Sequence, residues 1–303
     1  MQKLLVTSHP LITPYTFMSE LADMAIMRGD DTPYARALKP FNASLLRPFS
    51  IIYCVTDQAR LLYDQIKGST VPLFLILGRS VYPVTAAYKA FVKDCNVKHI
   101  FAQNCCVEED EYFTPIPLGV ENLHYGSHGH GSNSLGILLR AMEELGQAER
   151  SDGYFASFSV GTNKIERKEC LRFAASTSYT HFGSMAFNTS AIDQQTAFYR
   201  KLSSFRFSVC PWGNGIDTHR FWQSLCLGCQ PIVRKHAALR SFEDTGAIFI
   251  DTWDELTDYS HICALGQDAR SRMTPEKVFF DFWRDLIQRK MSELTQGAKP
   301  PYK

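Results

Sequence analysis

Residues 205–233 restrict what this chain can fold into more than any other segment. Two short apolar stretches flank a glycine-containing loop and an amphipathic stretch that ends in a glycine. In chain order these parts are 205–210, Gly213 to Gly215, 216–227, Gly228 and 230–233. A short apolar stretch bounded by turn residues is typical of a buried strand, and apolar residues three or four positions apart are typical of a helix. The segment therefore predicts a strand, a loop, a helix and a second, parallel strand.

The same alternation of apolar and amphipathic stretches recurs along the chain. Further strands are expected at 50–55, 72–77, 98–102, 114–118, 153–159, 179–182 and 247–250. Helices are expected at 57–67, 84–93, 135–145, 164–175, 191–202 and 275–294. Strands that alternate with helices build parallel sheets with helices on both faces. We therefore predict an α/β fold with two doubly wound, Rossmann-like domains.

The boundary between the two domains is predicted from composition. Residues 126–134 are rich in Gly, Ser and His and contain almost no large apolar residue, which is typical of a linker. We assign residues 1–128 to the first domain and 135–274 to the second. The helix within 275–303 has an apolar face and is expected to cross back to the first domain. A cleft between two such domains is where ligands bind in this architecture.

Charge, hydropathy and cysteine content exclude several classes of protein. The chain has 32 Lys and Arg against 31 Asp and Glu, so no overall field attracts nucleic acid or an anionic membrane. No apolar run approaches the roughly 20 residues of a transmembrane helix, and His9 and Pro10 interrupt the N-terminal apolar run. Nine cysteines, an odd number, argue against a disulfide framework. We therefore expect a cytoplasmic protein without a transmembrane segment.

Two groups of residues are candidate metal ligands. His124, His128 and His130 lie close together, and so do Cys226 and Cys229. Zinc sites usually need a second pair of ligands at similar spacing, which neither group has. The histidines are more consistent with the linker and the cysteines with small buried thiols. We expect neither a metal nor another cofactor.

The loop and helix within 205–233 have the features of an anion site. Gly213 and Gly215 let the backbone approach a ligand closely, and Asp217 or Thr218 can cap the following helix. The N-terminus of that helix favours a negative charge. In its first turn, Arg220 and His219 can donate hydrogen bonds to a phosphate. The alternative is that the glycines serve only the turn.

A second cation is predicted from residues 163–167. Asn163 and, three residues later, Glu166 have the spacing of a capping box at a helix start. This places Arg167 one turn into the helix, directed toward the interdomain cleft. Together Arg167 and Arg220 could neutralise a diphosphate without a metal. The alternative is that Arg167 pairs with Glu166 or Glu169 on an exposed helix face.

The 205–233 segment resembles the C-terminal signature of the exostosin-like glycosyltransferases. That signature reads Pro-x-Gly-Asn-Gly-x-Asp-x-His-Arg-x-Trp, followed by Gly-Cys-x-Pro-Ile-Val. The matching residues are Pro211, Gly213, Asn214, Gly215, Asp217, His219, Arg220, Trp222, Gly228, Cys229, Pro231, Ile232 and Val233. Residues 158–167, 101–104 and 116–122 are similar to bacterial and large-virus members. The resemblance covers roughly residues 70–290. It implies a GT-B architecture, in which two Rossmann-like domains face a cleft, with the acceptor on the N-terminal domain and the nucleotide sugar on the C-terminal one.

Two departures from the family pattern concern the reacting groups. Gln223 stands where relatives commonly have an acidic residue that suits a ribose, and Val81 stands where a family loop often has an Asp that serves as base. An inverting transfer needs a carboxylate or His within reach of the acceptor hydroxyl. The remaining candidates are Asp57, Glu121 and His9. If none serves, a retaining reaction or a binding role without catalysis follows.

The sequence therefore predicts a hexosyl or pentosyl glycosyltransferase of polysaccharide biosynthesis. It would move a sugar from a nucleoside diphosphate sugar to a hydroxyl of a glycan or glycolipid, inverting and independent of metal. Its partners would be these two substrates and no nucleic acid, and the acceptor could be membrane-bound. The expected donor-binding residues are Asn163, Arg167, Gly213, Asn214, Gly215, Asp217, His219, Arg220 and Gln223. The alternatives are a catalytically silent GT-B module that binds a nucleotide or carbohydrate, and a nucleotide-sugar epimerase.

Overall fold

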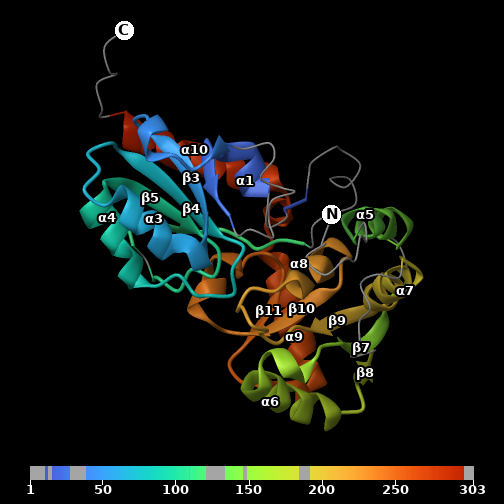
Figure 1. Cartoon of the computed structure of the whole chain (residues 1–303). Helices are drawn as coiled ribbons and strands as arrows, with labels where there is room; N and C mark the ends of the chain where they lie inside the picture. Colours follow the sequence, from blue (N-terminus) through green and yellow to red (C-terminus); the bar gives the residue numbers. More distant parts are fainter. Residues whose placement is uncertain are drawn as a thin grey trace. The chain divides into compact units, whose positions relative to one another are not determined.

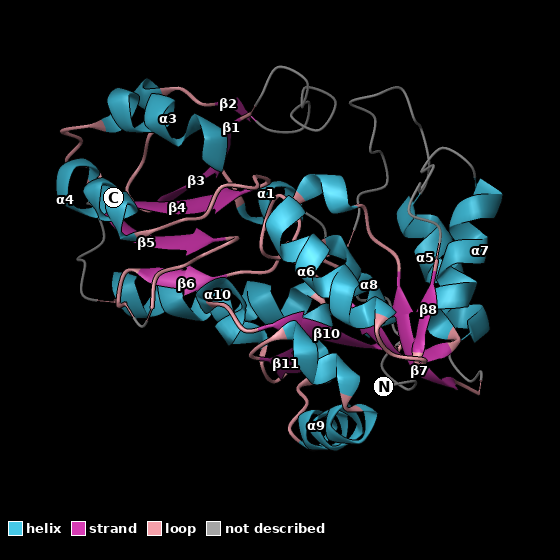
Figure 2. Cartoon of the chain, turned by 90° about the horizontal axis from the view of Figure 1, so that it is seen from below, coloured by secondary structure: helices cyan, strands magenta, loops and turns pink. Residues whose placement is uncertain are grey.

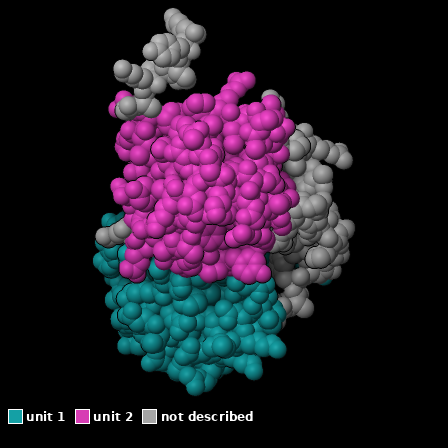
Figure 3. Space-filling view, turned by 60° about the vertical axis from the view of Figure 1, so that its left-hand side comes forward, with its two compact units in different colours: residues 1–13, 119–278 teal, residues 14–118, 279–303 magenta. Residues whose placement is uncertain are grey.

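The computed structural model describes residues 11–12, 16–27, 39–108, 110–120, 134–145, 149–183 and 192–296 (Figure 1). The chain forms two compact units, which Figure 3 colours separately. Unit 1 comprises Met1–Thr13 and Gly119–Val278, and unit 2 comprises Pro14–Leu118 and Phe279–Lys303. The predicted linker at 126–134 lies outside the described residues, apart from Ser134.

Unit 2 contains a six-stranded parallel sheet. Its strands are β1 (Met24–Ile26), β2 (Lys39–Pro40), β3 (Ser50–Val55), β4 (Leu73–Gly78), β5 (Val97–Ala102) and β6 (Phe113–Pro115), in the order β2-β1-β3-β4-β5-β6. Figure 2 shows β4, β5 and β6 running in the same direction. All six residues of β4 are buried, as expected for a central parallel strand that is covered on both faces.

The helices of unit 2 come from both ends of the chain. They are α1 (Thr16–Leu21), α3 (Ala59–Ile66), α4 (Lys89–Cys95), α10 (Phe280–Thr295) and the 3₁₀ helices η2 (Ala43–Leu45), η3 (Thr56–Gln58) and η4 (Ala86–Tyr88). Helices α3 and α4 bury Leu62 and Phe91 against the sheet. Figure 1 shows α10 on the other side of the sheet, where Phe280 packs edge-on against Phe17 of α1 at 5.4 Å between ring centroids.

Unit 1 contains a five-stranded parallel sheet. Its strands are β7 (Ser151–Ala156), β8 (Thr180–Phe182), β9 (Phe205–Val209), β10 (Gln230–Arg234) and β11 (Ile248–Ile250), in the order β11-β10-β9-β7-β8. Its α-helices are α5 (Ser134–Leu145), α6 (Lys164–Ala175), α7 (Ile192–Ser203), α8 (His219–Cys226) and α9 (Tyr259–Ser271). Its 3₁₀ helices are η5 (Val160–Thr162), η6 (Ala237–Phe242), η7 (Trp253–Thr257) and η8 (Pro275–Val278). None of the described helices in either unit is long and apolar enough to cross a membrane.

The predicted α/β class with two doubly wound parallel sheets is confirmed. The expected single helix at 275–294 is wrong in one respect, because extended backbone at Phe279 (φ −105°, ψ 146°) separates η8 from α10. That residue is also where the chain passes from unit 1 to unit 2. The sequence pattern missed β1 and β2, which are only three and two residues long.

Each sheet has one point at which its strand order reverses. In unit 1, β8 lies on one side of β7 and the chain then continues with β9 on the other side. In unit 2 the corresponding reversal lies between β1 and β3. Ligands of open α/β sheets bind outside the carboxyl ends of the strands at such points. The residues that follow β7 and β9, and those that follow β3, are therefore the first places to search for a site.

Gly119, the first residue of the long segment of unit 1, cannot accept a side chain. It has φ +78°, and a Cβ there would lie 2.2 Å from the carbonyl oxygen of Ile12, which accepts a hydrogen bond from the Val120 N–H (2.8 Å). We expect Gly119→Ala to lower the free energy of unfolding by about 3 kcal/mol, from backbone strain plus overlap. Gly68→Ala is the matched control, because Gly68 has φ +81° but no atom within 4 Å of the added Cβ. It should cost only the strain, about 1 kcal/mol. Equal losses in urea unfolding would contradict the overlap.

Candidate functional site

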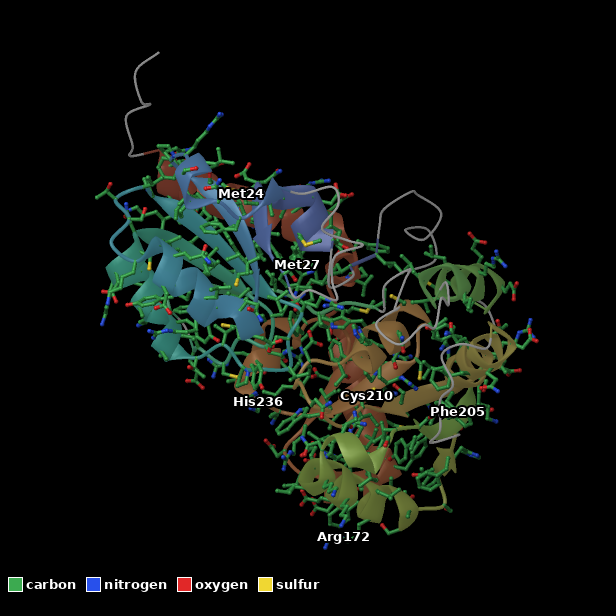
Figure 4. The ribbon with its side chains drawn as sticks, in the orientation of Figure 1. Met24, Met27, Arg172, Phe205, Cys210 and His236 are labelled. Carbon is green, nitrogen blue, oxygen red and sulfur yellow. The ribbon has the colours of Figure 1, made fainter. Side chains whose placement is uncertain are left out.

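The loop at the carboxyl end of β9 forms a tight turn at the strand-order reversal of unit 1. This glycine loop, residues 210–218, starts at Cys210, which Figure 4 labels at the end of the strand that begins at Phe205. Within it the Gly213 N–H donates to the Gly215 carbonyl (2.9 Å). Asn214 is exposed at the tip of this turn. The loop that follows the neighbouring strand β7 contains Ser159.

Arg167 joins these two loops. Its Nε donates to the Trp212 carbonyl (2.8 Å), Nη1 to the Ser159 carbonyl (2.8 Å) and Nη2 to the Pro211 carbonyl (3.4 Å). Three of the five guanidinium N–H groups are thus used on backbone oxygens. Burial lowers the pKa of Arg167. The alternative in which Arg167 pairs with Glu166 or Glu169 is wrong, because both carboxylates pair with Arg234.

Gly213 and Asn163 complete the contact between α6 and the glycine loop. A Cβ at Gly213 would lie 2.9 Å from Nη2 of Arg167, so a glycine is needed where the guanidinium crosses the loop. The Asn163 side chain caps α6, since its Oδ1 accepts from the Glu166 N–H (3.3 Å), and its Nδ2 donates to the Gly213 carbonyl (3.1 Å). The predicted N-cap is confirmed. Asn163 and Arg167 therefore hold the backbone of the loop in place.

Glu166 does not close the predicted capping box. Its carboxylate is buried and accepts a hydrogen bond from Trp253 Nε1 (3.0 Å), in addition to the ion pair with Arg234. Burial raises its pKa, which the Arg234 charge opposes. Asn163 and Glu166 have the spacing of a capping box. The partners of the Glu166 carboxylate, Trp253 and Arg234, instead come from distant parts of the chain. Sequence spacing alone could not show that the carboxylate joins α6 to η7 and β10.

Helix α8 begins at His219, directly after the loop and three residues later than the helix predicted at 216–227. Thr218 occupies the N-cap position and makes no side-chain capping hydrogen bond. Asp217 is buried, and its Oδ1 accepts a hydrogen bond from Trp222 Nε1 (2.8 Å). Asp217 thus fixes the tryptophan of the signature segment against the loop. Helix α8 follows β9 through the glycine loop, so its N-terminus lies at the carboxyl edge of the sheet.

Arg220 in the first turn of α8 is a half-buried cation without a matching anion among the described residues. Its Nε atom is buried and has no hydrogen-bond partner, and its guanidinium carbon lies 4.0 Å from the centroid of the Phe198 ring. No carboxylate of the described segments pairs with it. Burial lowers the pKa of Arg220, and the positive charge of Arg167 contributes in the same direction.

His219 and Gln223 have partners inside the protein. Nδ1 of His219 lies 2.8 Å from the Gly119 carbonyl, which can only accept, so Nδ1 carries the proton of that hydrogen bond. Gln223 is buried and its Nε2 donates to the Tyr199 hydroxyl of α7 (3.3 Å). The structure thus directs Gln223 toward α7. Its expected contact with a ribose stays a prediction that this geometry does not support.

Of the three candidates for a catalytic base, the structure describes one. His9 and Glu121 lie outside the described residues, as do His124, His128 and His130. Asp57 follows β3, and its Oδ1 accepts a hydrogen bond from Ser80 Oγ (2.7 Å). Sequence reasoning did not single out Ser80, although it belongs to the same loop as Val81.

Cys226 and Cys229 are buried free thiols, as interpreted from the sequence, and burial raises the pKa of each to about 12. Within the described segments, no three His, Cys, Asp or Glu side chains gather as metal ligands.

Comparison with known proteins gives similarities of fold only. No family model matches the sequence, and no curated protein matches it. The chain is similar to the crystal structure of an α1,3-fucosyltransferase, with 12% identity over 100% of this chain and 99% of that one and a TM-score of 0.48. It is also similar to a UDP-forming α,α-trehalose-phosphate synthase from Burkholderia vietnamiensis, with 11% identity over 88% and 76% and a TM-score of 0.48. A third is the pneumococcal O-GlcNAc transferase GtfA, with 10% identity over 81% and 58% and a TM-score of 0.39. Similarity at this level says nothing about activity, which is inferred from the site.

Proposed function

We propose that this chain is a GT-B glycosyltransferase of the exostosin-like kind. It moves a hexosyl or pentosyl group from a nucleoside diphosphate sugar to a hydroxyl of a glycan or glycolipid, with inversion and without a metal. The observation that supports this proposal best is Arg220, a cation whose buried Nε has no hydrogen-bond partner among the described residues. It lies at the start of α8, next to the glycine loop.

A half-buried cation with a buried N–H that has no hydrogen-bond partner is costly unless the site receives an anion. Leaving a buried charged donor unsatisfied costs more than leaving a neutral one, and the nearby Arg167 adds repulsion. A bound diphosphate removes both costs, because its oxygens accept from Arg220 and its negative charge offsets both guanidinium groups. The free N–H groups at a helix N-terminus act in the same direction.

The remaining residues of the site have supporting roles in this scheme. Arg167 and Asn163 position the backbone of the glycine loop, and Gly213 leaves room for the guanidinium. Asn214 at the exposed turn contacts the donor, and His219, with Nδ1 on Gly119, presents its other edge at the start of α8. As the glycosidic bond to the diphosphate breaks, negative charge develops on the leaving oxygen. The positive potential around Arg220 stabilises that charge, which is the task that a metal performs in other transferases.

We also propose a reducing compartment, the cytoplasm, for this activity. All nine cysteines are free thiols, and seven of them are buried. Disulfides are common in secreted proteins and rare in the cytoplasm. The acceptor can still be attached to a membrane.

The proposal is tested by titrating the protein with UDP, GDP, CDP and TDP, each with and without EDTA. We expect one of the four to bind tightly in both conditions, because the diphosphate is held by side chains. A ligand at a hundred times its dissociation constant should raise the free energy of unfolding by about 2.7 kcal/mol, measurable as a thermal shift. Absence of binding by all four, or binding that EDTA abolishes, would contradict the proposed site.

A catalytically silent module that binds a nucleotide sugar is the second candidate. It is favoured by Val81, an exposed apolar residue at the position where related loops often have an acid. A silent module would bind the nucleotide without transferring or hydrolysing the sugar. A nucleotide-sugar epimerase would convert the donor alone into an isomer, so product analysis with the donor alone separates it from a transferase.

A further inference from the structure

Strand β7 of unit 1 has a bulge at its amino end. Its register with β9 shifts between Ser151 and Tyr154, which leaves Asp152 and Gly153 out of the regular pairing. Gly153 has φ +111°, and a Cβ there would lie 2.5 Å from the Tyr179 carbonyl oxygen. Bulges are rare between parallel strands, and where they occur they redirect a side chain, often beside a functional site. The redirected side chain here is that of Asp152, which is 68% exposed.

Hydrogen bonds fix the Asp152 carboxylate beside a guanidinium. Its Oδ1 accepts from Nη1 of Arg206 on β9 (2.8 Å) and from the Tyr259 hydroxyl of α9 (3.1 Å). The same hydroxyl accepts from the Gly153 N–H (2.9 Å), so it also satisfies the bulged backbone. These bonds lower the pKa of Asp152 and keep it an ionised acceptor. In the part of the chain that the structure describes, Asp152 Oδ2 and Arg206 Nη2 have no hydrogen-bond partner.

The ring of Tyr179, just before β8, is ordered by stacking. It lies parallel to the Tyr259 ring, with 4.2 Å between the centroids and 10° between the planes. The Tyr259 ring in turn packs edge-on against Tyr154 and Phe207 of the core. Tyr179 nevertheless remains 43% exposed. A ring that is already ordered loses little conformational entropy when a ligand covers it.

The groups at this edge of the sheet match the chemistry of a sugar. The C–H face of a sugar ring is apolar and can cover an exposed aromatic ring. Each sugar hydroxyl donates one hydrogen bond and accepts others, so neighbouring hydroxyls can bond to a carboxylate and a guanidinium at the same time. Tyr259 contacts both Asp152 and Tyr179, which places the ion pair and the exposed ring within the span of a disaccharide. A free phosphate would instead be repelled by the exposed carboxylate.

We propose that Asp152, Arg206 and Tyr179 form a glycan-binding site at the amino edge of the unit 1 sheet, in which Tyr179 stacks on a sugar ring and the ion pair bonds its hydroxyls. The site is separate from the glycine loop. Phe205 and Cys210, labelled in Figure 4, mark the two ends of β9, and Arg206 is next to Phe205. Four residues of extended strand separate the two sites by about 13 Å. The site binds a glycan without reacting with it and does not depend on the proposed transferase function.

The first experiment tests the exposed ring, with cellobiose, maltose and lactose as probes and saturation-transfer NMR as the readout. At least one probe should bind the whole wild-type protein, and Tyr179→Ala should weaken that binding about tenfold. Tyr179→Phe keeps the ring and should bind within twofold of wild type. Tyr82→Ala is the matched control, because Tyr82 is an exposed tyrosine of unit 2 (58%). Failure of all three probes to bind, or equal binding by wild type and Tyr179→Ala, would overturn the site.

The second experiment tests the ion pair with the same probes. Asp152→Asn keeps the size and an oxygen for the Tyr259 hydroxyl, but it removes the charge and replaces one acceptor by a donor. We expect binding about tenfold weaker than wild type. Asp268→Asn is the matched control, because Asp268 forms an exposed ion pair with Arg272 in the same unit. Binding by Asp152→Asn equal to that of the control would contradict the proposed contact with the hydroxyls.

Further outcomes separate this site from the proposed donor site. The nucleotide selected by titration should not displace the probe, and displacement would place the probe at the glycine loop and overturn a separate site. If none of the four nucleotides binds, the transferase proposal fails, while probe binding that depends on Tyr179 still establishes the glycan site. Urea unfolding checks that each variant is folded. Should Tyr179→Ala fail to fold, Tyr179→Leu replaces it with an apolar side chain that has no ring, and the same loss is expected.

Discussion

Arg220→Met should weaken binding of the nucleoside diphosphate about a hundredfold while leaving the ligand-free protein more stable than wild type. The affinity falls because a buried, charge-assisted contact to the phosphate is lost, and such truncations cost roughly 2–5 kcal/mol. The stability rises because methionine fills a similar volume beside Phe198 and leaves no buried N–H without a hydrogen-bond partner. Replacing buried charges by apolar groups often stabilises, here by about 1 kcal/mol.

Calorimetric titration and urea unfolding without ligand measure the two effects separately. Arg200→Met is the matched control, because Arg200 lies on α7 of the same unit with its side chain 61% exposed and a long ion pair to Glu144. It should change neither quantity by more than the error. A stability loss in Arg220→Met would mean that Arg220 is satisfied inside the protein, and the main argument for an anion site would fall.

The opposite signs of these two effects describe how a binding residue differs from a packing residue. Phe221 and Trp222, the next two residues of α8, are buried and make only aromatic and hydrogen-bond contacts inside the protein. Their removal would lower stability. Arg220 is placed by the same helix and lies over the Phe198 ring, but its buried Nε has no hydrogen-bond partner among the described residues, and a bound anion would supply one.

The sequence predicted the fold correctly where an element depends on residues that are close together in the chain. The strand, glycine loop and helix within 205–233 lie where the pattern places them, because apolar runs and glycines report local conformation. No such pattern predicted the two strands within the first 50 residues, β1 and β2. Strand β1 (Met24–Ile26) gains its place by pairing with β3, a contact that no local pattern reports.

The candidate site was predictable in its residues but not in its contacts. Sequence spacing placed Arg167 one turn into α6, which is correct. It could not show that the guanidinium reaches the carbonyls of Pro211 and Trp212, since these residues are more than 40 positions away. The same holds for Asp57 and Ser80, which meet because β3 and β4 are neighbours in the sheet.

These contacts lead to a different expectation for Arg167 than for Arg220. Arg167→Ala removes the donors of three backbone carbonyls and should lower the free energy of unfolding by about 4 kcal/mol. Nucleotide affinity should fall with it, because the glycine loop loses its support. Arg167→Lys keeps the charge but not the planar fork, so it should recover only part of the stability.

Arg172→Ala is the control, since Arg172 is an exposed residue on the same helix, labelled in Figure 4, and lies over the ring of Phe173. Urea unfolding of the ligand-free variants and titration with the selected nucleotide give the two numbers to compare. For Arg167 we expect stability and affinity to fall together, whereas for Arg220 they move in opposite directions. If Arg167→Ala loses affinity but is as stable as Arg172→Ala, the guanidinium does not support the loop. In that case Arg167 is a direct ligand of the diphosphate, because only a contact with the ligand can be lost without cost to the empty protein.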